Sequence, residues 1–443
     1  MKTKLLFLLS SLVLIAASCS NNREEHLLET VPLEASYIGV VRLDKLSSQL
    51  GDEGQAALKE ILDNSAKSLD SKWKYFFSDE SQVDFSSPLV IFSYKRATIA
   101  TFMVKSESKF REAMEKATGS TFIKSDGVES CAEGTIYLKE NQAWFATSYP
   151  QVESADIASF LSLSEKESIV SQKFLSQLLD HKDDITTFVN IEKIMEGSLD
   201  FQSRMAVNMI FDDASYMISH TSLEKDKIEN EIVFLNYKSE PTSLAIKTSK
   251  IDTKSIREFS GKGDFCFAIS VDPELVKALV RQVKNFAPIP SDIRATLEDL
   301  DGDVIVSANV KDSTDILSSL SVMLTFNSSA SATAAAEFLK NFAGGDTKST
   351  RIFTDGKKCY FMADVQGASE VSPYAESFKN ANLGVVILPT LFNSIGKPEI
   401  ARLVKEISIM LYDDNKGAKI KSVVNLQEGS NSLVTILKLV GKQ

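Results

Sequence analysis

The stretch YIGVVRLD occupies residues 37–44, and it predicts a step from a buried strand into a helix. Its apolar, β-branched start is typical of a strand that is covered on both faces. Asp44 can cap a helix at 45–50, which Gly51 would end, and the apolar spacing that follows predicts a second helix at 54–69. The chain therefore opens its folded part with a strand and two short helices.

The same step recurs in the second half of the chain. Residues 264–271 predict a strand, and Asp272-Pro273 opens a helix that reaches residue 286, with proline in the first helical turn. The elements after each step follow the same order, although the two halves share little sequence. A coincidence between two ordinary strings of helices and strands is the alternative explanation.

Three further pairs of elements match between the halves. They are a helix ended by glycine (106–118 and 328–342), a strand running into a helix (186–191 and 383–388), and a long hairpin (214–237 and 406–427). A last strand is expected at 431–440. We therefore predict the α+β class, with two similar halves that each form a mostly antiparallel sheet with helices packed on it.

This pattern divides the chain into a first α+β domain at 31–240 and a second at 263–443. The segment 241–262 between them contains proline, serine, threonine and glycine, which predicts a linker.

The N-terminal segment has the composition of an export signal. Lys2 and Lys4 precede an apolar run of about 13 residues, which is shorter than the roughly 20 residues of a membrane-spanning helix. Small residues then lead to Cys19, as in a bacterial lipoprotein signal. We expect a signal peptide at 1–18, lipidation of Cys19 and a solvated, lipidated tether at 19–30. A plain secretory peptide and a single-pass anchor are the alternatives.

The residues after Cys19 bear on the location of the protein. Ser20 is not the aspartate that retains lipoproteins at the inner membrane of enteric bacteria, so we expect an outer-membrane lipid anchor. Glu24 and Glu25 make a weak version of an acidic surface-export signal. The periplasmic and the surface-facing side both remain open.

Composition excludes some classes of partner. The chain has 443 residues, 43% hydrophobic content and a net charge of −11. It contains no basic patch, so a nucleic acid partner is not expected.

Three cysteines remain besides Cys19, and an odd number leaves at least one thiol unpaired. Cys266 lies in an apolar strand, whereas Cys131 and Cys359 could pair only with their Cα atoms within about 7 Å.

Three places in the sequence carry a resemblance to a known family. They are the signal ending at Cys19, the opening Pro32-Leu33-Glu34-Ala35 with 37–46, and the step Leu300-Asp301-Gly302-Asp303-Val304. Together they resemble an uncharacterised family of Bacteroidetes lipoproteins known only as a domain of unknown function. The resemblance implies an exported, anchored protein, and it implies no activity, cofactor or catalytic residue.

No strong catalytic motif is present. The sequence lacks HExxH, CxxC, a phosphate-binding GxxxxGK and GxSxG. His181 falls in a charged turn, and His220 falls in a predicted strand, where a hydrogen-bonding or exposed role is expected. A non-enzymatic protein is therefore the first expectation, an enzyme is the alternative, and no cofactor is expected.

Two clusters are candidate binding residues. Asp299, Asp301 and Asp303 alternate around a glycine, and hard cations bind such oxygen ligands, but the calcium-loop spacing is missing. A polar turn is the simpler interpretation, so no metal site is assigned. The second cluster is the aromatic run of Trp73, Tyr75, Phe76 and Phe77, which predicts either an exposed platform for a glycan or apolar partner, or part of the core.

We therefore expect a lipid-anchored cell-envelope protein that serves as a binding or architectural module. Its expected partners are the membrane, through the lipid, and an unidentified envelope protein or glycan. A carboxylate-based hydrolase is an alternative, because a catalytic pair among 60 acidic residues is invisible in sequence. A periplasmic chaperone or assembly factor is another, and it would need an exposed apolar patch.

Overall fold

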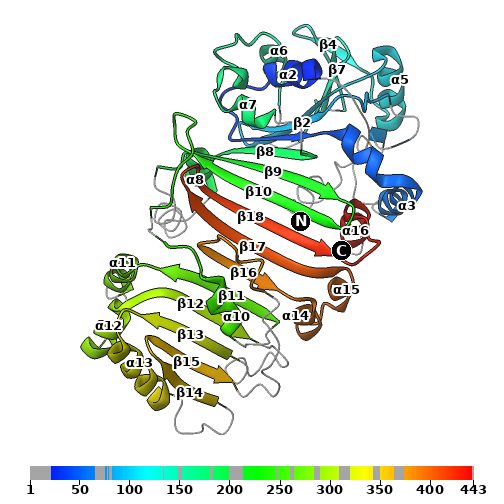
Figure 1. Ribbon diagram of the computed structural model, residues 1–443. Helices are drawn as coiled ribbons and strands as arrows, with labels where there is room; N and C mark the ends of the chain where they lie inside the picture. The colour runs from blue at the N-terminus through cyan, green and yellow to red at the C-terminus, as the bar shows by residue number, and fades with distance from the viewer. Residues whose placement is uncertain are drawn as a thin grey trace. The chain divides into compact units, whose positions relative to one another are not determined.

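The computed structural model describes residues 21–64, 75–76, 78, 82–132, 134–147, 152–179, 183–198, 213–245, 248–259, 264–283, 290–308, 320–342, 350–363 and 374–441 (Figure 1). The chain forms two compact units. Unit 1 comprises Met1–Arg204, Ala214–Glu240 and Glu428–Gln443, and unit 2 comprises Met205–Asp213 and Pro241–Gln427. Both combine helices with an antiparallel sheet, so the predicted α+β class is confirmed.

The sheet of unit 1 has its first strand near the middle. In spatial order its strands are β10 (Lys227–Leu235), β9 (Tyr216–Glu224), β8 (Ile185–Asn190), β1 (Tyr37–Val41), β2 (Leu89–Tyr94), β3 (Ala97–Met103), β7 (Gln142–Ala146), β6 (Ile136–Lys139), β5 (Val128–Cys131) and β4 (Ile123–Ser125). All these pairings are antiparallel. β1 is buried, as its β-branched sequence predicts, because it pairs with β2 and β8 and is covered on both faces.

Helices cover the two faces of this sheet and complete two apolar cores. On one face, Phe110 and Met114 of α5 (Glu107–Thr118) pack with Leu46 and Leu50 of α3 (Leu43–Asn64) and with residues of α16 (Ser432–Gly441). On the other face lie α2 (Asn21–Glu29), α6 (Ser154–Phe160), the 3-10 turn η2 (Ile169–Ser171) and α7 (Leu175–Leu178). The helix α8 (Ile191–Ser198) follows β8 directly.

The helix α3 is broken where the sequence predicts. Gly51 has φ 54° and ψ −171°, which interrupts the helix, and helical geometry resumes through Asn64. The end of the predicted second helix, beyond residue 64, lies outside the described residues. Gly119 likewise ends α5 in the left-handed region, at φ 70°.

Unit 2 is built around β11 (Phe265–Val271), which also lies inside its sheet. The spatial order is β18 (Gly417–Leu426), β17 (Val404–Asp414), β16 (Leu383–Ile387), β11, β12 (Leu300–Ala308), β13 (Leu320–Phe326), β15 (Lys358–Ala363) and β14 (Thr350–Asp355), again all antiparallel. α11 (Pro273–Val283), α12 (Ser291–Glu298) and α13 (Ser329–Phe342) lie side by side along one face (Figure 1). The opposite face packs on α10 (Thr253–Glu258), and α14 (Pro389–Ser394) and α15 (Pro398–Ala401) follow β16.

The structure corrects three sequence predictions about boundaries. The expected strand at 431–440 is the helix α16, because Leu433 and Leu437, one turn apart, enter the core beside α3. The expected linker at 241–262 contains α10, whose neighbours Ile251 and Phe259 are buried with Ile256 in the core of unit 2. Residues 428–443 therefore belong to unit 1, although the second domain was expected to extend to 443.

The expected solvated tether is also corrected from Asn21 onward. Residues Asn21–Glu29 form α2, in which Leu27 and Leu28 are fully buried and Glu24 is 4% exposed. The apolar residues Leu27, Leu28 and Val31 give this short segment a buried face, which the charged residues around them concealed in the sequence. Within the described ranges, no helix combines the length and apolar character that crossing a membrane requires.

Candidate functional site

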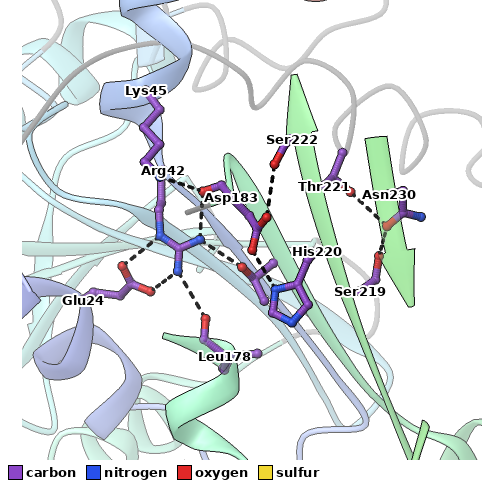
Figure 2. A network of polar contacts seen from close by, with 11 residues as sticks. Glu24, Arg42, Lys45, Leu178, Asp183, Ser219, His220, Thr221, Ser222 and Asn230 are labelled. Carbon is purple, nitrogen blue, oxygen red and sulfur yellow. Dashed lines mark hydrogen bonds and ion pairs between the residues drawn. The ribbon is translucent and has the colours of Figure 1, made fainter. Parts of the chain in front are cut away.

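A buried arginine forms the centre of a polar cluster in unit 1 (Figure 2). Arg42 directly follows β1 and is 4% exposed. Its Nε and Nη2 donate to the two carboxylate oxygens of Glu24, at 3.3 and 2.8 Å. Nη2 also donates to the Leu178 carbonyl (3.2 Å), and Nη1 donates to the Asp183 carbonyl (3.1 Å) and to Thr186 Oγ1 (2.9 Å). All five donor positions of the guanidinium are thus occupied.

This arrangement makes Arg42 a structural junction. Its partners lie on α2 and in the stretch 178–186, which runs from the end of α7 into β8, so one side chain connects two parts of the chain that are distant in sequence. A buried arginine is tolerated only when a counter-charge and acceptors replace its hydration. The cluster therefore fastens α2 to the sheet of unit 1.

Asp183 connects this junction to β9. His220 Nδ1 lies 2.8 Å from Asp183 Oδ2, a contact at ion-pair distance that lacks the alignment of a hydrogen bond. Ser222 Oγ donates to Asp183 Oδ1 at 3.1 Å, and Lys45 Nζ donates to the Asp183 carbonyl at 3.4 Å (Figure 2). His220 and Ser222 stand two residues apart and therefore share one face of β9.

The order of these three groups differs from that of a hydrolytic triad. In a triad the imidazole lies between the nucleophile and the carboxylate, so that it can take the nucleophile's proton. Here the carboxylate of Asp183 lies between Ser222 and His220, and the serine hydroxyl donates to it. On the other face of β9, Ser219 donates to Asn230 Oδ1 at 2.6 Å, which ties β9 to β10.

A cleft of 710 Å³ lies beside the junction. Lys45 and Gln49 of α3 line one side of it, and Asp184, Glu224 and Lys225 are among the residues that line the rest. The cleft therefore combines two cationic and two anionic side chains. Such a lining fits a small polar ligand better than an apolar one.

Asp184 is the most perturbed acid of this cleft. Its oxygens accept from the Leu223 backbone N–H at 2.6 Å and from Gln49 Nε2 at 3.2 Å, while Asn431 Nδ2 donates to the Gln49 carbonyl at 2.5 Å. Burial raises the pKa of Asp184 above its ordinary value, because desolvation outweighs the hydrogen bonds that favour the charged form. A carboxyl group of this kind retains its proton to a higher pH than a solvated one.

The predicted aromatic platform is not exposed where the structure describes it. Phe76 is fully buried, and its ring packs edge-to-face with Phe102 at a centroid distance of 4.9 Å. Tyr75 is 9% exposed and packs against Phe110. These two residues belong to the core, because the rings around them offer more apolar contact than the surface does. Trp73 and Phe77 lie outside the described residues.

The three aspartates proposed as weak metal candidates have different surroundings. Asp299 accepts from the backbone and hydroxyl of Ser328 at the start of α13, Asp301 is exposed, and Asp303 is buried and accepts from the Asp252 backbone. Burial raises the pKa of Asp303. In the described part of the chain, no group of three or more His, Cys, Asp or Glu residues could hold a metal ion.

The remaining candidate residues are distributed as follows. Cys131, Cys266 and Cys359 are buried free thiols, and Cys131 lies in unit 1 whereas Cys359 lies in unit 2. Cys19 and His181 lie outside the described residues.

Sequence reasoning missed the Arg42–Glu24 pair. The available signal was a charged residue directly after the apolar run YIGVV, at the border of a strand buried on both faces. That position predicts a buried charge, which needs a partner. Nothing in the local sequence identified Glu24 as this partner.

Comparison with known proteins adds no family. No family model matches the chain, and no curated protein matches it. Among solved structures, crystal form I of TP0453 is similar at 8% identity, covering 48% of this chain and 79% of that one, with a TM-score of 0.31. Crystal form III of TP0453 covers 47% of this chain and 78% of that one, with 8% identity and a TM-score of 0.28. Likenesses this weak carry no argument about function.

Proposed function

We propose that this chain is a lipid-anchored protein of the cell envelope, held at the outer membrane through Cys19, and that its α+β units serve a binding or architectural role. The N-terminal sequence supports the anchor. The geometry of α2 supports a particular consequence of that anchor, which is that the folded body lies close to the lipid.

The short distance between Cys19 and α2 is the observation that carries the proposal. α2 begins at Asn21, and two residues span at most about 7 Å of extended chain. Leu27 and Leu28 bury α2 in the core, and the pair of Glu24 with Arg42 fastens it. A lipid on Cys19 would therefore hold unit 1 directly against the membrane surface, without a long flexible spacer.

The polar cluster supports a non-enzymatic role. Arg42 uses all its donors within the protein, and the Asp183 carboxylate separates the serine from the histidine that a triad would join. These side chains therefore bind other parts of the chain.

Metabolic labelling tests the anchor. The chain is expressed with its own signal in the presence of an alkyne analogue of palmitate, and the label is detected on the purified protein. We expect label on the unsubstituted chain and on the matched control Ser20→Ala, and none on Cys19→Ala. The label is the readout, because an uncleaved signal would itself retain Cys19→Ala in the membrane. An unlabelled wild-type chain whose mass shows an unmodified Cys19 would refute the anchor.

Binding assays test the role. Co-sedimentation with purified envelope glycan, and capture from solubilised envelope by the full chain, examine the two expected partner classes. Protease treatment of intact cells determines the side, since only a surface-facing chain is cleaved. A chain that binds no envelope protein or glycan would retain only the architectural interpretation.

One observation favours the alternative of a carboxylate-pair hydrolase. Asp184 and Glu224 line the same cleft, and burial raises the pKa of Asp184, as a general acid requires. Turnover of glycan substrates that is abolished by Asp184→Asn, and retained by Ser48→Ala at the same cleft, would establish it. The absence of turnover by the wild-type chain on such substrates would remove it.

We also propose that the chain is a duplication of one α+β domain. The support is the order of pairing within each unit. β1 pairs with β2 and β8 as β11 pairs with β12 and β16, and β3 pairs with β7 as β13 pairs with β15. A helix follows both β3 and β13, and a hairpin follows both β8 and β16. An experimental structure in which β16 did not pair with both β11 and β17 would contradict this proposal.

A further inference from the structure

Among the described strands, β14 lies at the edge of the sheet of unit 2 (Figure 1). Within the described residues, β15 is its only strand partner. Four of its six residues are exposed, namely Arg351, Phe353, Thr354 and Asp355, and Phe353 is 41% exposed. An edge strand presents unpaired backbone N–H and C=O groups to any chain that can align with it.

The hairpin determines which backbone groups of β14 face outward. β14 and β15 are joined by the two-residue turn Gly356-Lys357, so Asp355 and Lys358 form the closing pair, which exchanges both backbone hydrogen bonds. Because the backbone N–H and C=O groups of successive residues in a strand point to opposite sides, those of Phe353 and Arg351 also face β15. The backbone groups of Thr350, Ile352 and Thr354 face the open edge.

The side chains of β14 are complementary to themselves in one register. In a second copy of β14 that lies antiparallel to the first, the outward-facing backbone groups must bond with those of Ile352 and Thr354 in the first copy. The allowed registers therefore differ from one another by steps of two residues. In the register centred on Phe353, Ile352 of each copy pairs with Thr354 of the other. Arg351 of each copy then lies opposite Asp355 of the other, and the two Phe353 side chains lie opposite each other.

We propose that β14 pairs antiparallel with β14 of a second copy of this chain, in the register centred on Phe353. The neighbouring registers centred on Ile352 or Thr354 lack the two Arg351–Asp355 pairs. Opposite charges that face each other across strands stabilise a sheet, and like charges destabilise it. The partner is therefore chosen by charge as well as by backbone hydrogen bonding.

The surroundings of β14 are consistent with this interface. Phe353 stacks on Tyr360 of β15 with ring centroids 4.7 Å apart, and the Arg351 guanidinium lies 5.9 Å from the Phe353 ring. Lys358, which is opposite Asp355 in the hairpin, donates to Ser255 Oγ at 3.1 Å on α10. The Lys358 ammonium group is therefore engaged with α10, and the Asp355 carboxylate is available to a second copy.

Unit 1 shows that a strand in this position can accept another. β6 pairs with β7, as β14 pairs with β15, and β6 carries β5 on its other side in antiparallel orientation. The second copy of β14 would take the place that β5 takes beside β6. This inference does not depend on lipidation of Cys19 or on any activity.

Disulfide cross-linking tests the pairing. In a non-hydrogen-bonded antiparallel pair the Cα atoms are about 4.5 Å apart, which a disulfide can span. Phe353→Cys in the full chain is therefore expected to form a disulfide-linked dimer under mild oxidation. The matched control is Ile409→Cys on β17, because Ile409 is 40% exposed and lies away from the edge. The unsubstituted chain controls for cross-links through its native cysteines.

Further variants test the register and the charges. Arg351→Cys alone is expected to give no dimer above the control, because its two copies would be four residues apart, about 13 Å. Together with Asp355→Cys it is expected to cross-link. In the Phe353→Cys background, Arg351→Glu should lower the dimer yield about tenfold, since it replaces two attractive pairs by two repulsive ones. Arg351→Asp combined with Asp355→Arg should restore the yield.

Each outcome has a definite meaning. A dimer yield of Phe353→Cys no greater than that of Ile409→Cys would overturn the proposal. Efficient cross-linking of Arg351→Cys alone, or indifference to charge reversal, would overturn the register. Circular dichroism of each variant confirms that its fold is retained.

Discussion

Removing the carboxylate of Glu24 should destabilise unit 1 strongly, because it leaves the charge of Arg42 buried without its counter-charge. The side chains of this pair are 5% and 4% exposed, and Glu24 accepts two of the five hydrogen bonds of the guanidinium. Breaking a buried ion pair on one side costs about 3–5 kcal/mol. Glu24→Ala should therefore lower the free energy of unfolding of unit 1 by about 4 kcal/mol.

Arg42→Met should cost at least as much as Glu24→Ala. It leaves the Glu24 carboxylate buried and also removes donors from the Leu178 carbonyl and Thr186 Oγ1. The double variant should cost less than the sum of the two, because the second change removes the charge that the first left unpaired. Lys95→Ala is the control, since Lys95 forms an exposed pair with Asp156.

Tryptophan fluorescence during urea unfolding of the full chain provides the assay. Both tryptophans of the chain, Trp73 and Trp144, belong to unit 1, and Trp144 is buried in the same core as Leu27 and Leu28 of α2. With a slope of about 3 kcal/mol per molar urea, a loss of about 4 kcal/mol moves the midpoint by about 1.3 M. A shift as small as that of Lys95→Ala would refute the view that this pair fastens α2.

Three other predictions concern thiols, pH and a turn. Burial raises the pKa of Cys266 to about 12 and of Cys359 to about 11, so neither should react with Ellman's reagent at pH 8 until the chain unfolds. In the unfolded chain three thiols should react, and a fourth reactive thiol would contradict acylation of Cys19. Burial also raises the pKa of Asp303, so the folded state binds its proton more tightly than the unfolded state does. The contribution of Asp303 to the stability of the folded state is therefore greatest below the ordinary pKa of 3.8 and is lost as the pH rises through the raised pKa. Asp303→Asn should remove this pH dependence from urea midpoints measured by circular dichroism, and an unchanged dependence would refute the assignment. At the β17–β18 turn, Gly417 has φ 101°, and an added Cβ would lie 2.7 Å from Pro241 Cβ. Gly417→Ala should therefore lower the free energy of unfolding by about 1–3 kcal/mol in the same assay. The loss should exceed that of Gly429→Ala, whose Cβ would meet nothing within 4 Å.

The elements that the sequence predicted well depend on neighbouring residues. The strand at Tyr37–Val41 and the break of α3 at Gly51 both follow from local conformational preference and apolar spacing. The long hairpin of β9 and β10 has the same origin. These features require no knowledge of distant contacts, which is why sequence alone indicated them.

The candidate site depended on contacts that sequence spacing does not contain. Arg42 reaches Glu24 across 18 positions and Thr186 across 144, and Asp184 reaches Gln49 across 135. The cleft and the raised pKa of Asp184 arise only when these segments meet. Burial of Tyr75 and Phe76 likewise depends on rings from β3, β7 and α5.

By itself, the sequence determined the α+β class, the strand-to-helix step at 37–44 and the break of the following helix at Gly51, because these are set by residues close together in the chain. Only the tertiary structure decided that the apolar run at Ser432–Gly441 is a helix and that the polar start Asn21–Glu29 is part of the core. Both segments are compatible with more than one local conformation. The segment of Leu433 and Leu437 is helical because both side chains then pack in the core beside α3. The helix α2 is fixed by the buried ion pair of Glu24 with Arg42.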